Sequence, residues 1–354
     1  MRIEPNDVLC QNLAVLTANY PKLAEKLNIA QNGEGATLVK TDSGDYTCVV
    51  DLPEGKKVFL HSRRNPQNEA VRLIDKFDFL ATRVWVLLGL GLGYHLFELI
   101  KRVDPLPQML VIEKNIDVFK RSLTVFDWQG ILKRKEIELF IGEEKEEIER
   151  RIREKYFSQM LEVGTQVIKH GPSVKLLPHY YLILSKYEMR RVDIGCGRNP
   201  KDGYIGVDKS SNVGPDVVCD LEHEELPFKD STIEKVYSYQ CLEHIGDLTH
   251  ALREIHRICK PGAKVYISTP YATDILHISN PHHVTNFTEH TFDFYTGKYG
   301  QESDYGIDFR FKVLDMGFYY HKEFENKPPE EQRWAREHLL NVVWKIDYNL
   351  EVVK

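Results

Sequence analysis

The stretch that decides the fold of the second half is RVDIGCGRNPKDGYIGVDKSSNVGPDVVCD, residues 191–220. Its pattern predicts three short apolar strands, each ending in a polar or glycine-rich turn. These turns contain Asp193-Ile194-Gly195-Cys196-Gly197, Gly206-Val207-Asp208 and Cys219-Asp220-Leu221. In an open parallel sheet the carboxyl ends of the strands line the ligand crevice, so we expect these residues to surround one ligand.

The residue types at these turns suit a ligand that contains a nucleoside. Gly195 and Gly197 allow a ligand to approach the backbone where a Cβ would clash. Asp208 can accept hydrogen bonds from both hydroxyls of a ribose. Asp220, with the backbone of Leu221, can recognise the edge of an adenine.

The flanking sequence continues the α/β pattern. Strands are predicted at 235–239, 264–268, 309–316 and 342–353, and a helix at 247–259 is expected to end because of Pro261-Gly262. In the first half, a helix over 8–27 and a β-rich stretch precede strands at 84–88 and 109–112. The first of these strands is followed by Gly89-Leu90-Gly91-Leu92-Gly93 and the second by Glu113. The pattern predicts an α/β protein with two Rossmann-like modules.

Length and charge support two modules. A chain of 354 residues corresponds to about two domains. Residues 1–187 have 27 basic and 25 acidic side chains, whereas residues 188–354 have 20 and 28. We therefore predict domains 1–187 and 188–354, neither basic enough for a dedicated nucleic-acid binder.

Composition excludes several other classes of protein. With 42% apolar and 28% charged residues, the chain is not disordered. The longest apolar stretch, residues 84–100, is interrupted by three glycines, His95 and Glu98, so no membrane span is predicted. The N-terminus lacks a signal sequence and the six cysteines are scattered, which favours a cytoplasmic protein with reduced thiols.

Residues 189–271 resemble the class I S-adenosylmethionine-dependent methyltransferases. The segment DLEHEELPFKDSTIEKVYSYQCLEHIGDLTHALREIHRICKPGAKVYIS, residues 220–268, follows the order of that family's motifs. The resemblance implies a mostly parallel seven-stranded sheet and S-adenosylmethionine as cofactor. It places Asp193, Gly195 and Gly197 near the methionine moiety, Asp208 at the ribose, Asp220 and Leu221 at the adenine, and Gln240 at the cofactor edge. Cys196 and Lys209 complete the expected cofactor site.

A methyl acceptor that is a hydroxyl or a protonated amine needs a base. The candidates are Glu243 and His244, which follow the fourth strand, and His283, beside His282 in the segment 271–299. The aromatic side chains of that segment, including Tyr271, Phe287, Phe292, Phe294 and Tyr295, suit a substrate lid, but the composition also fits an ordinary packed loop, which is the favoured interpretation for any single residue. We predict no metal site, because His277, His282, His283 and His290 lack a recognised ligand spacing.

Residues 23–186 resemble the N-terminal region of the motility accessory factor family, bacterial proteins linked to flagellin glycosylation. FLHSRRNPQNEAVRLID, VLLGLGLGYHLFELI and VIEKNIDVFKRSL carry this resemblance. The N-terminal half either binds a nucleotide or nucleotide-sugar at Gly89, Gly91, Gly93 and Glu113, or it is a recognition or assembly module in which the glycine turn is only structural. Arg63-Arg64 is either a contact for phosphate or part of a solvated loop, and the loop is the favoured interpretation.

Together the two resemblances imply a methyltransferase acting on a small molecule, with a sugar, a glycan or a glycan precursor as the favoured acceptor. A protein partner for the N-terminal half is a further expectation. Two alternatives stay open: a non-catalytic adaptor in surface glycosylation or motility, and nucleotide-dependent glycosyl or phosphoryl transfer by the N-terminal half.

Overall fold

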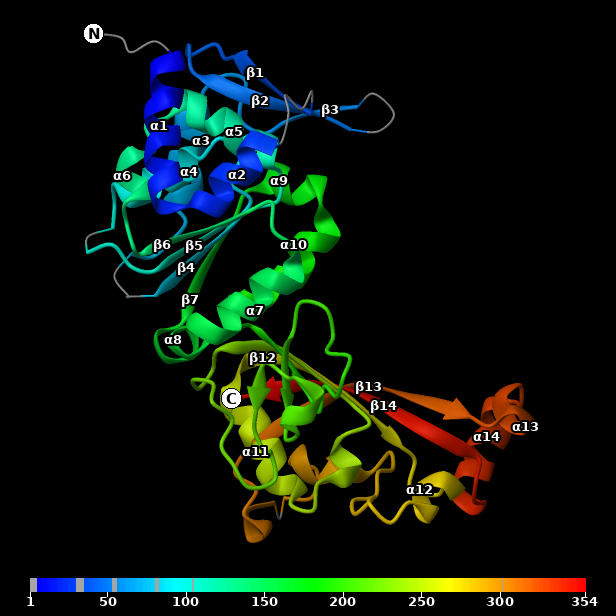
Figure 1. The fold of residues 1–354 in the computed structure, drawn as a ribbon. Coiled ribbons are helices and arrows are strands. Elements are labelled where there is room, and N and C mark those ends of the chain that lie inside the picture. Colours follow the sequence, from blue (N-terminus) through cyan, green and yellow to red (C-terminus); the bar gives the residue numbers. More distant parts are fainter. Residues whose placement is uncertain (1–4, 30–34, 53–55, 80–82, 104, 301) are drawn as a thin grey trace. The chain divides into compact units, whose positions relative to one another are not determined.

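A computed structural model describes residues 5–29, 35–52, 56–79, 83–103, 105–300 and 302–354 of the chain (Figure 1). The chain divides into two compact units, Met1–Glu188 and Met189–Lys354, and each contains its own sheet of parallel strands. Within the described part of the chain, no helix combines the length and the apolar character needed to cross a membrane.

The N-terminal unit begins with two helices, α1 (Pro5–Asn19) and α2 (Pro21–Ile29), so the prediction of one helix over residues 8–27 is wrong. Pro21 lacks an N–H group and disfavours helical backbone at Tyr20, which ends the first helix. The antiparallel strands β1 (Ala36–Lys40), β2 (Tyr46–Asp51) and β3 (Lys57–Phe59) follow. Helix α3 (Pro66–Ile74) starts where the Asn65 side chain accepts a hydrogen bond from the Asn68 N–H.

A four-stranded parallel sheet in the order β6-β5-β4-β7 forms the centre of this unit. Its strands are β4 (Val84–Leu88), β5 (Met109–Glu113), β6 (Ile137–Ile141) and β7 (Thr165–Lys169). The connecting and following helices are α4 (Tyr94–Ile100), α5 (Ile116–Val125), α6 (Gln129–Leu132), α7 (Lys145–Lys155), α8 (Phe157–Val163), α9 (Gly171–Leu176), α10 (Pro178–Leu184) and η2 (Ser185–Glu188). Strands β4 and β5 are buried along their whole length, as expected for strands with both faces covered.

Strand order fixes where a ligand crevice lies in this sheet. The chain passes from β4 to β5 and β6 in one direction, and β7 then pairs with the other edge of β4. The direction of winding therefore switches between β4 and β7. In open α/β sheets, crevices form at the carboxyl ends of strands at such a switch point.

The C-terminal unit is built on a seven-stranded sheet in the order β10-β9-β8-β11-β12-β14-β13. The strands are β8 (Arg191–Ile194), β9 (Ile205–Asp208), β10 (Val217–Val218), β11 (Ile233–Tyr239), β12 (Cys259–Pro270), β13 (Arg310–Tyr320) and β14 (Val343–Val353). Strand β14 pairs antiparallel with both of its neighbours, β12 and β13, and all other pairs in this sheet are parallel. The predicted mostly parallel seven-stranded sheet is confirmed.

The helical segments of this unit are η3 (Ser211–Val213), η4 (Leu242–His244), α11 (Leu248–Ile258), α12 (Ile275–Ser279), η5 (Thr291–Tyr295), η6 (Glu302–Tyr305), α13 (Lys322–Glu325) and α14 (Pro329–His338). Strands β13 and β14 form a long hairpin with α13 and α14 at its tip (Figure 1). Helix α11 spans Leu248–Ile258, within one residue of the predicted bounds at each end, and Pro261-Gly262 follows it inside the start of β12. The strand begins at Cys259, which already pairs with Ile233 of β11.

Candidate active site

A cavity of about 530 Å³ lies at the carboxyl ends of β8, β9 and β11 in the C-terminal unit. Six of the nine predicted cofactor residues line it: Gly195, Asp208, Lys209, Asp220, Leu221 and Gln240. Other lining residues come from η4 and the residue after it and from the segment after α12: His244, Ile245, Pro281, His282 and Val284. The volume falls within the range of small-molecule and cofactor sites.

Two carboxylates face this cavity from the ends of neighbouring strands. Asp208 accepts hydrogen bonds from the backbone N–H groups of Gly197 (3.0 Å) and Ser210 (2.9 Å). Asp220 accepts one from the N–H of Glu222 (3.1 Å). A carboxylate has about four lone-pair positions, so both side chains keep capacity to accept hydrogen bonds from ligand hydroxyl or amino groups.

The backbone of β8 and β11 is tightly packed where it borders the cavity. Gly195 has a φ of +69°, and a Cβ there would lie 2.3 Å from Cys241 Sγ. Gln240, at the end of β11, also has a positive φ of 51°, which strains a residue other than glycine. Its side-chain Nε2 is buried without a hydrogen-bond partner among the described residues. An unsatisfied donor at a cavity wall is a free group for a ligand acceptor.

The other three predicted cofactor residues do not line the cavity. Asp193 is buried and accepts a hydrogen bond from the Lys201 N–H (2.8 Å), so it holds the loop between β8 and β9. Burial raises the pKa of Asp193 to about 6. The Cys196 thiol is buried, and Gly197 contributes its N–H to Asp208.

The three predicted catalytic side chains lie together next to the cavity. Donor atoms of Glu243, His244 and His283 are within 4.8 Å of one another, and the rings of His244 and His283 have centroids 4.8 Å apart. Among the described residues this is the one group of three or more side chains that could hold a metal ion. This group differs from the set of His277, His282, His283 and His290 that was examined for a metal site in the sequence. His290 instead pairs with Asp293 (3.0 Å).

Hydrogen bonds distinguish the roles open to the two histidines. His283 contacts Asn280 Nδ2 through Nε2 and His277 Nδ1 through Nδ1, both at 2.9 Å. Because an amide NH₂ can only donate, the network assigns the proton of His283 to Nδ1. His244 Nδ1 donates to the carbonyl of His282 (2.9 Å), which leaves its Nε2 as the acceptor nitrogen.

Glu243 is the most enclosed member of this group. Its side chain is 1% exposed, and its Oε2 has no hydrogen-bond partner among the described residues. Burial raises the pKa of Glu243 to about 7. Desolvation and the neighbouring His277 lower the pKa of His283, so that ring is neutral at neutral pH.

The aromatic residues predicted to form a lid mostly belong to the core. Phe287, Phe292 and Tyr295 are buried, and Phe292 packs against Tyr348 of β14 with ring centroids 4.7 Å apart. Of the five aromatic residues named for the lid, only Phe294 is substantially exposed. The lid interpretation is therefore wrong for four of the five side chains, Tyr271, Phe287, Phe292 and Tyr295, which are buried as in an ordinary packed loop.

The glycine turn of the N-terminal unit is satisfied by the chain itself. Glu113 is 3% exposed, and its Oε2 accepts hydrogen bonds from the N–H groups of Leu90 (2.8 Å) and Gly91 (3.0 Å). The N–H of Leu92 donates to His61 Nε2 (2.8 Å). Those of Gly89 and Gly93 donate to the carbonyls of Ile112 and Leu90. All five N–H groups of the turn are thus occupied.

Each unit contains one match to a protein family, over about two thirds of the N-terminal unit and just under half of the C-terminal unit. Residues 57–181 match the Glycosyltransferase Maf N-terminal domain, and residues 192–267 match the Methyltransferase domain. The C-terminal unit is thus similar to the methyltransferase domain family over residues 192–267. Both resemblances stated for the sequence are therefore confirmed.

Individual relatives match only part of this chain. A sterol 4-C-methyltransferase of Caenorhabditis elegans is 32% identical over 71 residues, which cover 19% of this chain and 21% of that protein. A norajmaline N-methyltransferase of Rauvolfia serpentina is 27% identical over 109 residues, 30% of this chain and 34% of that protein. The chain thus spans about a fifth to a third of these relatives.

Two of the solved structures that this chain matches are described as methyltransferases. One is an S-adenosylmethionine-dependent methyltransferase from Archaeoglobus fulgidus, with 18% identity, a TM-score of 0.34, and coverage of 58% of this chain and 94% of that one. The other, a possible histamine N-methyltransferase from Thermotoga maritima, has 16% identity, a TM-score of 0.31, and coverage of 58% and 98%.

Several residues that line the cavity of the C-terminal unit were not predicted from the sequence. Cys241, Ile245, Pro281 and Val284 line it together with the predicted residues. Pro281 and Val284 lie in irregular segments, where no periodicity marks the side chains that turn inward. Cys241 could have been predicted as a cavity residue, because it directly follows Gln240 at the end of a predicted strand.

Proposed function

We propose that the protein is an S-adenosylmethionine-dependent methyltransferase whose reaction takes place in the C-terminal unit. One observation carries this proposal: the cavity at the strand ends is lined by the carboxylates of Asp208 and Asp220 and by His244, whose Nδ1 contacts the His282 carbonyl and so leaves Nε2 as the acceptor nitrogen. The match to a methyltransferase domain over residues 192–267 supports it.

The cofactor residues follow from this arrangement. Asp208 would hold the ribose, because its carboxylate is fixed by two backbone N–H groups and retains free lone pairs. Asp220 and Leu221 would hold the adenine, and the unpartnered amide of Gln240 would donate to the cofactor. Asp193 would act indirectly, through the loop that it anchors at Lys201.

Bound S-adenosylmethionine supplies a methyl group attached to a positively charged sulfur. The protein's contribution is then alignment of the acceptor and removal of its proton. In this proposal His244 Nε2 takes that proton, since its Nδ1 is committed to the His282 carbonyl. Glu243 stabilises the resulting charged ring, and His283 positions the pair, because its two nitrogens already hold Asn280 and His277.

For the acceptor we propose a hydroxyl or amine of a sugar, a glycan or a glycan precursor. The support is the match of residues 57–181 to a Maf glycosyltransferase N-terminal domain in the same chain. The two relatives named above are described as sterol and norajmaline methyltransferases, so an acceptor screen should also include small lipids and amines.

A thermal-shift measurement tests the cofactor directly. A ligand at about 100 times its Kd stabilises a protein by about 2.7 kcal/mol, which is a readily measured shift. S-adenosylmethionine and S-adenosylhomocysteine should both give it, and the shift should shrink in Asp208→Asn. A protein that responds to neither compound is not this methyltransferase.

Turnover then separates an enzyme from an adaptor. Labelled S-adenosylmethionine is incubated with sugars, nucleotide sugars, sterols and amines, and transfer of label is measured with the native protein and with His244→Ala. Label on one acceptor class, reduced in the variant, supports the proposal. Binding without transfer to any acceptor class favours the non-catalytic adaptor.

A further inference from the structure

The N-terminal unit has a cavity of its own, of about 690 Å³. It lies next to the glycine turn whose N–H groups are all hydrogen-bonded within the chain. It is lined by residues of the loop after β3, of α3, of the start of α4, and of the end of β7. Tyr94 and His95 follow β4, whereas Lys169 and His170 mark the end of β7. The cavity therefore lies at the switch point between β4 and β7, where open α/β sheets place their ligands.

Positive charge dominates the rim of this cavity. Arg64, Arg72, Lys76 and Lys169 line it, against the single carboxylate of Glu69. Glu69 is already engaged, because its Oε2 accepts a hydrogen bond from the Ser62 N–H (2.8 Å). Lys169 pairs with Glu188 (2.6 Å).

The other three cations of the rim hold no ion pair with any residue in the described part of the chain. Asn68, Arg72 and Lys76 recur every four positions, which aligns them along one face of α3 and its C-terminal extension. Arg64 reaches the same cavity from the loop before that helix. Its neighbour Arg63 instead stacks over the Phe59 ring at 5.1 Å.

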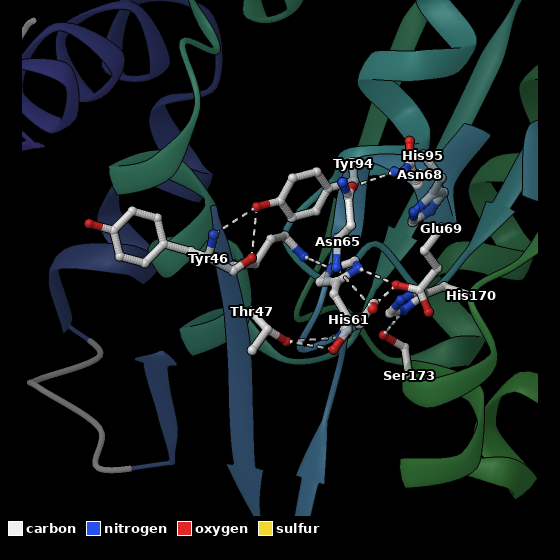
Figure 2. A network of polar contacts seen from close by, with 12 residues as sticks. Tyr46, Thr47, His61, Asn65, Asn68, Glu69, Tyr94, His95, His170 and Ser173 are labelled. Carbon is white, nitrogen blue, oxygen red and sulfur yellow. Dashed lines mark hydrogen bonds and ion pairs between the residues drawn. The ribbon is translucent and has the colours of Figure 1, made fainter. Parts of the chain in front are cut away.

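The floor is polar but uncharged (Figure 2). His61, His95 and His170 are all at most 5% exposed, and the His170 ring stacks on that of His95 (centroids 5.1 Å apart) and contacts that of His61 at a tilt (4.7 Å). Burial lowers the pKa of His61 to about 3 and that of His95 to about 4, and it also lowers the pKa of His170. The net charge facing a ligand therefore comes from the cations of the rim.

The glycine turn makes this floor possible. A Cβ at Gly91 would lie 2.5 Å from His61 Nε2, and a Cβ at Gly89 would lie 2.5 Å from Ser173 Cβ. Ser173 in turn contacts His170 Nδ1 through its hydroxyl (2.7 Å), as Figure 2 shows. The glycines are thus required for the close approach of the segments that carry the histidines, and not for contact with a phosphate.

We propose that this cavity binds a phosphate-bearing small molecule, with its phosphate groups held by Arg64, Arg72 and Lys76. Guanidinium groups bind phosphate through paired, charge-assisted hydrogen bonds, and an ammonium adds a point charge. The remainder of the ligand lies against Tyr94 and the histidines. The site is independent of the methyltransferase proposal, because all of its residues belong to the N-terminal unit.

Calorimetry with the full chain at low salt tests this site, with inorganic pyrophosphate and uridine diphosphate as probes. We expect saturable binding of at least one probe at ligand concentrations up to about 5 mM. Arg72→Gln and Arg64→Gln should each weaken it by about tenfold, because each loses a charge-assisted contact. The matched control is Lys133→Gln, which removes an exposed cation outside the cavity and should leave affinity within about twofold.

The two probes identify which part of the ligand is recognised. Tighter binding of uridine diphosphate than of pyrophosphate supports a site that also contacts a nucleoside, and equal affinities support recognition of phosphate alone. Absence of binding for both probes overturns the proposal. So does an equal loss of affinity in Lys133→Gln, or displacement of pyrophosphate by saturating S-adenosylhomocysteine, which would place the anion in the other unit.

Discussion

Asp208 and Glu113 occupy equivalent positions in their sequences, yet their surroundings differ. In each unit a glycine turn follows the first parallel strand, and the acid is the last residue of the next strand. Glu113 is buried, and one of its oxygens accepts two N–H groups of its own turn. Asp208 is partly exposed and lines a cavity. An acid that is fixed but still accessible can bind a ligand, whereas a fully buried one stabilises the turn.

Substitution of Asp208 should therefore affect binding more than folding. Asp208→Asn keeps one acceptor for the backbone N–H groups but loses the charge. A charge-assisted hydrogen bond contributes about 1.5–3 kcal/mol, so S-adenosylhomocysteine should bind at least about tenfold more weakly by calorimetry. Asp304→Asn, at an exposed position away from the cavity, is the control. Unchanged affinity in Asp208→Asn would show that the ribose assignment is wrong.

Glu243 should make stability depend on pH. Burial raises its pKa from 4.5 to about 7 in the folded state, so folding favours the protonated form. Its contribution is present below about pH 4.5 and is lost as pH rises towards 7. Relative to the native protein, Glu243→Gln should therefore gain thermal stability between pH 5 and pH 8, by up to a few kcal/mol since one pKa unit corresponds to about 1.4 kcal/mol.

The matched control for this pH series is Glu330→Gln, an exposed acid in the first turn of α14. It should follow the native melting curve at every pH. Parallel curves for the native protein and Glu243→Gln would mean that Glu243 does not titrate in this range.

His244 and His283 should differ in their effects on turnover. Loss of a general base lowers the rate by about 10²-fold or more, so we expect His244→Ala to do so without changing cofactor affinity. The pH–rate profile of His244→Ala should also lose its acidic limb. His283→Asn keeps a polar group for the network and should retain most turnover. A large loss in His283→Asn with a normal rate in His244→Ala would reverse the assignment.

At the scale of elements, the turn after β8 offers a comparison between two glycines. Both Gly195 and Gly197 have positive φ, but only Gly195 lacks space for a side chain, because of Cys241. Gly195→Ala should therefore destabilise the C-terminal unit more than Gly197→Ala, whose added Cβ meets no atom within 4 Å. Thermal unfolding of the two variants measures the difference. Equal melting temperatures would show that the turn relaxes around Cys241.

The sequence predicts best what depends on periodicity and on strand ends. Asp208 ends β9, and Asp220 and Gln240 follow β10 and β11, so the topology of the parallel strands alone brings these positions to one cavity. Pro281 and Val284 reach the cavity through irregular backbone, which leaves no pattern to detect. Tyr20 shows a third case: the helical pattern continues across it, but Pro21 breaks the backbone.

The two glycine turns show the main limit of sequence patterns. Both have the residues expected next to a nucleotide, but Glu113 and His61 take up the N–H groups of the N-terminal turn. His61 lies 28 positions before the turn's first glycine, Gly89, so local sequence does not indicate that contact. Only the tertiary structure distinguishes a turn that is open to a ligand from one that is filled by its own chain.

The last prediction concerns the whole molecule. Each unit has its own sheet and is of ordinary domain size, so fragments 1–188 and 189–354 should each fold on its own. The cofactor cavity is lined by residues between 194 and 284. Fragment 189–354 should therefore bind S-adenosylhomocysteine within about threefold of the full chain, measured by calorimetry. Fragment 1–188 should unfold cooperatively but not bind it, because the N–H groups of its glycine turn are occupied. Saturable binding by fragment 1–188 would require a second cofactor site, and loss of binding by fragment 189–354 would mean that the N-terminal unit completes the first.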